Sequence, residues 1–164
     1  MQQVGFVKVS RILIAIPPLL ARITLASAFI ASGRGKFKDL NGTAGFFKQL
    51  GIPASTVLAP FVAANEVLAG SLVGLGLFTR FAAVPLAAVL SVATGTARRK
   101  EVHSVTDLTQ LMEFGYLLLL LELMANGGGE ISVDRLIQQR VRRAARELEE
   151  KAPDLEAMKL TEAA

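Results

Sequence analysis

The chain has 164 residues, of which 52% are hydrophobic, and carries a net charge of +4 with no cysteine and one histidine. The lack of cysteine excludes disulfide bonds, thiol redox chemistry and thiolate metal sites within the chain. The lysine and arginine residues are spread over the connecting segments and the C-terminal part, so we expect them to meet membrane-surface phosphates and not nucleic acid.

Four long apolar stretches dominate the first three quarters of the sequence. They cover residues 12–32, 58–78, 81–97 and 108–125. Each is close to the ~20 residues that a helix needs to cross a bilayer. The helices of a soluble domain would show a polar face with the helical period, whereas these stretches are apolar blocks with little relief. The sequence therefore predicts an all-α protein in which residues 1–128 form a membrane four-helix bundle.

The first apolar stretch has some features of a cleavable signal peptide, because basic residues precede it and small residues follow. Arg22 interrupts that pattern, so we interpret the stretch as a retained first helix. Pro17 and Pro18 are expected either to kink this helix or to mark its start.

The connections between the stretches differ in length and character. In the first connection, residues 43–50 predict a short interfacial helix that is stopped by Gly51 and Pro53. Only Thr79 and Arg80 separate the second and third stretches, which predicts a tight antiparallel hairpin. The third connection holds His103, which we interpret as a loop residue because a metal site needs further ligands.

The region after residue 128 predicts a helix of another kind. Ser132 can cap this helix, and Asp134 in its first turn would favour the positive end of the helix dipole. Residues 129–150 predict an amphipathic basic helix. Its pattern is typical of a helix on an anionic leaflet, with a solvated polar tail as the alternative. Residues 151–164 are acidic and poor in large apolar side chains, which predicts disorder.

Three of the apolar stretches carry an ionisable residue deep inside. Counting along ideal helices places Arg22 roughly 15 Å, and Glu66 and Glu113 each roughly 18 Å, from the same face of the membrane. Because an isolated charge in the bilayer is costly, we expect the three side chains to share one buried polar site. A second polar level is expected nearer the cytoplasm, where Glu122 could meet Arg80 or Arg11.

Two interpretations of the buried polar site stay open. The site could be a structural salt bridge that orients the helices, with Glu66 as the partner of Arg22. Alternatively, because one arginine and two glutamates leave one negative charge, Glu113 could bind a proton or a ligand could complete the site. Glu66 shares a stripe with Gly70 and Gly74, which predicts a close approach between helices.

These residues together resemble the pattern of the DoxX family of small bacterial and archaeal membrane proteins. The resemblance covers residues 20–136. It rests on Arg22, Gly33, Lys36, the stretch 47–53 (Phe-Lys-Gln-Leu-Gly-Ile-Pro), Glu66 with Gly70, the stretch 76–80 (Gly-Leu-Phe-Thr-Arg), Glu113 and the stretch 129–134 (Gly-Glu-Ile-Ser-Val-Asp). The basic context of Arg34 and Gly35 and the basic tail past Arg140 depart from the family pattern.

The resemblance implies a four-helix bundle in the bacterial inner membrane. Members of the family have been linked to membrane redox systems, including a thiosulfate:quinone oxidoreductase subunit and complexes that handle oxidative stress. The family's polar positions correspond here to Arg22, Lys36, Glu66, Arg80, Glu113 and Asp134. Because anionic lipid on the cytoplasmic leaflet favours the basic helix, we expect both termini in the cytoplasm.

Three functions compete at this point. The first is an accessory subunit of a membrane redox assembly, more an interacting subunit than an enzyme by itself, with a quinone as candidate ligand and a redox protein as partner. The second is a small proton-coupled transporter, and the third is a non-catalytic scaffold. No covalently bound cofactor and no metal are expected, and self-association into a homo-oligomer is an open expectation.

Overall fold

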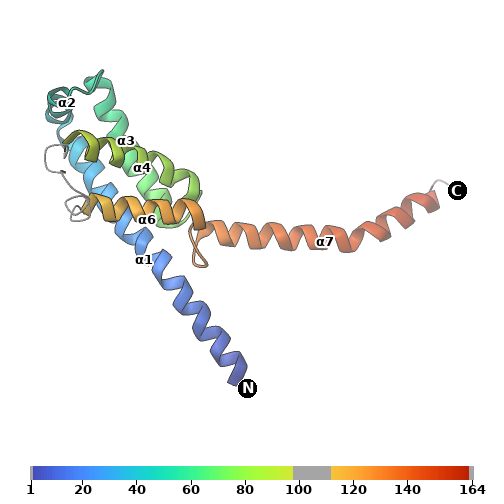
Figure 1. Cartoon of the computed structure of the whole chain (residues 1–164). Coiled ribbons are helices and arrows are strands. Elements are labelled where there is room, and N and C mark those ends of the chain that lie inside the picture. Colours follow the sequence, from blue (N-terminus) through green and yellow to red (C-terminus); the bar gives the residue numbers. More distant parts are fainter. Residues whose placement is uncertain (1, 98–111, 163–164) are drawn as a thin grey trace.

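A computed structural model describes the backbone of residues 2–97 and 112–162 and the side chains of residues 14–96 and 112–149. All regular structure in these ranges is α-helical (Figure 1), which confirms the predicted fold class. The helices are α1 (Gln2–Lys38), α2 (Leu40–Gln49), α3 (Ser55–Leu75), α4 (Thr79–Ala97), α6 (Met112–Asn126) and α7 (Val133–Glu162).

Three of the helices are long and apolar enough to cross a membrane, over Ile14–Lys38, Ser55–Leu75 and Thr79–Thr96. Of the fourth predicted span, the structure describes α6 with 15 residues, so its crossing stays a prediction. His103 lies outside the described residues. We call α1, α3, α4 and α6 the helical core.

The helical core packs along the chain of neighbours α1, α3, α4 and α6. Its interior is filled by fully buried side chains such as Leu25, Val73, Leu86 and Leu120. Other large apolar side chains point outward, and Phe81 is 77% exposed. Because a lipid-facing surface must be apolar as well, this arrangement suits a protein that lies in a bilayer.

α1 and α3 approach each other closely along small residues. A methyl group added at Gly74 would lie 2.9 Å from Ala26 Cβ, and one at Gly33 would lie 2.8 Å from the carbonyl oxygen of Ala63. Gly70 faces α1 in the same way, at 3.2 Å from Phe29 Cβ. The predicted close approach along the Glu66 stripe is confirmed.

The short connections also follow the sequence. α2 begins at Asp39, whose carboxylate accepts a hydrogen bond from Gly42 N at 2.8 Å, and ends before Gly51, which has a φ of 76°. α3 and α4 are joined by residues 76–78 only, which confirms the predicted hairpin.

Several helix boundaries differ from those that we expected. α2 begins at Leu40 and not at residue 43, and Thr79 and Arg80 belong to α4 and not to the turn before it. α1 runs from Gln2 through Pro17 and Pro18, so the prolines do not mark its start. α7 continues to Glu162, past Lys151, where the sequence predicted disorder. Residues 151–162 are rich in alanine, glutamate, leucine and lysine, which are strong helix formers, and this composition favours continuation of the helix.

Candidate functional site

Arg22 is buried, with 3% of its surface exposed, and is the most buried charged side chain in the described part of α1, residues 14–38. Its guanidinium donates to the carbonyl oxygens of Val73 at 3.0 Å and Gly74 at 2.8 Å, near the end of α3. It also donates to the carbonyl oxygens of Gly128, at 2.9 Å, and Ile131. The last carbonyls of a helix lack intrahelical partners and carry partial negative charge. The buried guanidinium of Arg22 therefore supplies hydrogen-bond donors to the last carbonyl groups of α3. It also links residues 128–131 to that end of the helix.

The predicted ion pair between Arg22 and Glu66 is wrong, and the reason is the register of α1 against α3. The contacts of Gly33 and Gly74 described above show that the two helices are antiparallel, which puts Arg22 level with the end of α3. Glu66 lies seven residues before Val73, roughly 10 Å away along the helix. The depth estimate failed because α1 begins at Gln2 and extends beyond the end of α3.

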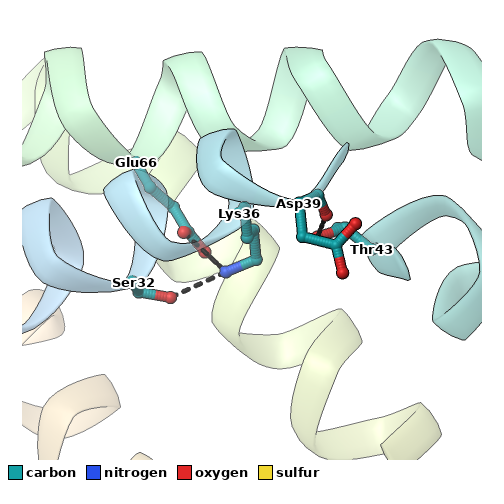
Figure 2. Close-up of polar contacts among 5 residues, drawn as sticks. All are labelled: Ser32, Lys36, Asp39, Thr43 and Glu66. Atoms are coloured by element: carbon teal, nitrogen blue, oxygen red, sulfur yellow. Dashed lines mark hydrogen bonds and ion pairs between the residues drawn. The ribbon is translucent and has the colours of Figure 1, made fainter. Parts of the chain in front are cut away.

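Glu66 pairs instead with Lys36, at the opposite end of the contact between α1 and α3. Lys36 Nζ lies 2.6 Å from Oε2 and 2.8 Å from Oε1 of Glu66, and it also donates to Ser32 Oγ at 2.7 Å. Figure 2 shows these three side chains pointing toward one another. The Glu66 side chain is 5% exposed and that of Lys36 is 22% exposed. The charges balance locally in this pair.

Glu113 lies in the first turn of α6 and is half-buried. Arg22 binds Gly128, directly after the other end of α6. Fourteen residues separate Glu113 from Gly127, which is roughly 21 Å along a helix. Arg22 and Glu113 are therefore at opposite ends of α6, and the structure does not bring the three predicted residues into one site. The titration of Glu113 stays a prediction.

Asp134 lies in the first turn of α7, as predicted, and has a second role as well. Its carboxylate accepts hydrogen bonds from Phe78 N at 2.7 Å, Thr79 N at 3.0 Å and Thr79 Oγ1 at 3.0 Å. It therefore also caps the start of α4, 55 residues earlier in the chain. The predicted cap of α7 is confirmed, because Ser132 Oγ accepts from Arg135 N at 3.2 Å.

We call residues 127–134 the docking segment. A Cβ on Gly76, which has a φ of 71°, would lie 2.6 Å from Arg22 Cζ. A Cβ on Gly128 would lie 2.7 Å from Thr79 Oγ1. Phe78 has a φ of 49°, which is uncommon for a bulky residue, and its backbone N–H is held by Asp134. Glycine and an enforced backbone conformation thus let the docking segment fit tightly against the α3–α4 turn.

The docking segment forms one wall of a cleft with a volume of ≈ 880 Å³. The other walls come from the first half of α1, the start of α4, the end of α6 and the start of α7. The apolar lining is Ile14, Pro17, Pro18, Phe78, Phe81 and Ile137, and the charged lining is Arg80, Glu122, Glu130, Asp134 and Arg135. The cleft thus combines aromatic and aliphatic surface with both signs of charge, as sites for small molecules commonly do.

Two polar atoms of residues that line the cleft are buried beneath their neighbours without a hydrogen-bond partner. They are Glu122 Oε2 and Arg135 Nε. Glu122 Oε1 accepts from Asn126 at 3.3 Å, and Arg135 Nη2 lies 2.8 Å from Glu130. Leaving buried polar atoms unpaired destabilises a fold, so such atoms at a cleft point to a ligand.

The predicted contact between Glu122 and Arg80 is not found among the described residues. Both side chains line the cleft, yet no ion pair joins them within the described part of the chain. The side chain of Arg11 lies outside the described residues. The sequence analysis missed Arg135, although its place directly after the Ser132 cap could have drawn attention to it. In the residues that the structure describes, no three carboxylate or imidazole groups are grouped to hold a metal ion.

Comparisons with known proteins agree with this architecture. The chain is 33% identical over 121 residues to a Bacillus subtilis protein named "Putative oxidoreductase CatD", which covers 73% of this chain and 85% of that protein. It is 42% identical over 74 residues to "Uncharacterized membrane protein Rv3486" of Mycobacterium tuberculosis, covering 43% of this chain and 45% of that protein. An uncharacterized protein of Haemophilus influenzae is 28% identical over 74% of this chain and 83% of its own length.

No solved structure is significantly similar to the chain. The sequence profile of the DoxX family matches residues 18–99, which carry Arg22, the Lys36–Glu66 pair and the α3–α4 turn. With this match and the Bacillus subtilis relative, the chain belongs to the DoxX family of membrane proteins.

Proposed function

We propose that this protein is the membrane subunit of a redox assembly and that the cleft beside the docking segment binds a quinone head group. The observation that carries the proposal is that Glu122 and Arg135, each with one unpartnered side-chain atom, line a cleft that also has aromatic walls. A quinone supplies two carbonyl acceptors on a flat apolar ring and takes up two electrons and two protons.

The residues of the cleft fit these needs. Arg135 is a partly exposed cation whose Nε donor has no partner, and Arg80 lines the same cleft. Phe78 and Phe81 offer aromatic surface for a flat ring, and a prenyl tail suits the lipid that surrounds the helices. In the proposal, proton transfer to the reduced quinone is assigned to the carboxyl group of Glu122, which lines the cleft.

In this proposal, a partner protein supplies the two electrons that reduce the quinone. The chain has no cysteine and a single histidine, so it offers few ligands for a redox metal of its own. The name of the Bacillus subtilis relative supports a redox role, and the mixed lining of the cleft supports a small-molecule ligand. In this proposal Arg22 and Asp134 position the wall of the cleft, and Glu122 and Arg135 contact the head group.

The experiment measures binding of a photoreactive ubiquinone or menaquinone analogue to the purified full chain in lipid nanodiscs. Crosslinks should map to residues of the cleft, and natural quinone should compete. Arg135→Gln should weaken binding about tenfold, because it removes a hydrogen bond from a charged donor. Glu122→Gln should leave binding largely intact and abolish proton uptake when quinone is reduced through an added partner.

Arg140→Gln is the matched control, because Arg140 is exposed on α7 and does not line the cleft. Crosslinking that is equal in the chain with and without Arg135, or that maps to the outer lipid-facing surface, would contradict the proposal. In that case the transporter and scaffold alternatives would be the ones to test.

A further inference from the structure

We infer that the exposed part of α7, residues 137–148, binds the anionic phospholipid headgroups of the leaflet at which the helix begins. α7 leaves the rest of the molecule as a single helix (Figure 1). Its described contacts with the helical core are made by its first residues, where Asp134 and Arg135 lie against the docking segment and the α3–α4 turn. The remainder of the helix is therefore available to another surface.

One face of this helix is apolar and uncovered. Ile137, Val141 and Leu148 are 46%, 62% and 68% exposed, and Ala144 lies between them. The spacing of four, three and four residues puts these side chains on one stripe of an α-helix. Exposed apolar side chains that form a stripe mark an interaction surface, whereas single ones need no explanation.

The polar side of the same segment is strongly basic. Arg140, Arg142, Arg143 and Arg146 are all exposed, and no acidic residue lies between the first and the last of them. A short apolar stripe combined with arginines is the composition of a helix at the boundary between headgroups and acyl chains. Phosphate is the group that a cluster of guanidinium groups binds best.

The start of α7 is fixed close to the membrane boundary. Asp134 caps α4 at the turn where α3 ends, and both of these helices are long and apolar enough to cross a membrane. Arg22 binds the docking segment to the same end of α3. The arginines thus follow directly on a membrane-embedded region, and basic clusters in that position bind anionic lipid. This argument is independent of the quinone proposal.

A second copy of the chain fits the exposed face of α7 less well than an anionic leaflet does. Two α7 helices that run side by side from the same membrane face in the same direction would bring the arginine cluster of one against that of the other. Like charges in that arrangement repel. An anionic leaflet instead complements the arginines and accepts the apolar stripe at the same time.

The test uses the full chain in nanodiscs, where the lack of native cysteine allows a single spin label at Val141→Cys. The accessibility of the label to water-soluble and lipid-soluble relaxation agents reports its depth. In discs that contain phosphatidylglycerol the label should be shielded from water, and in pure phosphatidylcholine discs or at high salt it should be exposed. A label at Gln139→Cys, on the opposite face, should stay accessible to water in both lipids.

A second set of variants replaces the four arginines by glutamine, which keeps the helix propensity. Each replacement should lower the ratio of membrane-bound to free α7 by about fivefold, because a basic residue near an anionic surface contributes about a factor of five. Equal accessibility of the Val141 label in anionic and neutral discs would overturn the inference. Shielding that disappears when each disc holds one copy of the protein would overturn it in favour of self-association.

Discussion

The two ends of the contact between α1 and α3 satisfy a buried cation in different ways. At one end, Lys36 meets a carboxylate side chain, and the two charges compensate each other. At the other end, Arg22 meets four backbone carbonyls from two separate segments. The first arrangement is a local pair that two substitutions can remove together. The second is a junction that holds three parts of the fold, so its loss should affect stability and the cleft at once.

The largest effect is expected for Arg22→Gln. A neutral side chain cannot satisfy four carbonyls with one amide group, and the buried acceptors lose their partner. We expect the free energy of unfolding in detergent to fall by about 3–5 kcal/mol. Arg22→Lys should recover less than half of this loss, because an ammonium lacks the planar fork. A loss no larger than that of Arg34→Gln, on the exposed side of α1, would show that the junction contributes little.

The second prediction tests how tightly the residues around Arg22 are packed. Gly76→Ala adds a methyl group 2.6 Å from Arg22 Cζ, at a φ of 71°. Strain and overpacking together should lower the free energy of unfolding by about 2–4 kcal/mol. Gly35→Ala is the matched control, because nothing lies within 4 Å of the added group, and alanine in a helix should be neutral or stabilising. Both are measured by thermal unfolding in the same detergent.

The third prediction concerns the pair at the other end. Glu66→Gln leaves the Lys36 ammonium without its carboxylate and should lower the free energy of unfolding by about 1–3 kcal/mol. Adding Lys36→Gln should restore part of the loss, since the double variant buries no unpaired charge. Strictly additive losses in the double-mutant cycle would argue against direct pairing. The same cycle between Glu66 and Arg22 should show additivity.

The smallest effect is expected for the cap of α4. Asp134→Asn weakens three hydrogen bonds at a helix start and should lower the free energy of unfolding by about 0.5–2 kcal/mol. Glu130→Gln provides the comparison, because its ion pair with Arg135 is exposed and should contribute at most about 1 kcal/mol. If Asp134→Asn changes stability no more than this control, the docking segment is held mainly by Arg22 and by the backbone hydrogen bond from Asp134 N to Gly76 O.

The sequence predicted the helices better than it predicted which polar side chains contact one another. The short gap predicted at Thr79 and Arg80 indicated a hairpin, and the structure has its turn at residues 76–78. The stripe of Gly70 and Gly74 predicted a close contact between helices. Both rest on short-range spacing. The partner of Glu66 depended on the register of α1 against α3, which spacing within one helix does not give. Lys36 was recognised as a polar position but was not connected to Glu66.

The hydrogen bonds of Arg22 could not be predicted from the sequence for a second reason. Sequence patterns show charged side chains, whereas the partners of Arg22 are backbone carbonyls, which every residue has. Asp134 also caps a helix that begins 55 residues earlier, and its position in the first turn of α7 gave no sign of this second contact. The cleft residue Arg135 had no pattern of its own and emerged only from the arrangement of the docking segment.

The junction at Arg22 also has a consequence for the order in which the chain assembles. The guanidinium bonds to Gly128 and Ile131 join residues 106 and 109 positions apart, and the Asp134 cap forms only after the docking segment has been made. During synthesis, α1 and α3 can therefore pack before Arg22 has formed its two hydrogen bonds to Gly128 and Ile131. Arrival of residues 127–134 closes the fold, so a chain cut short before them leaves two of the four hydrogen bonds of Arg22 unmade.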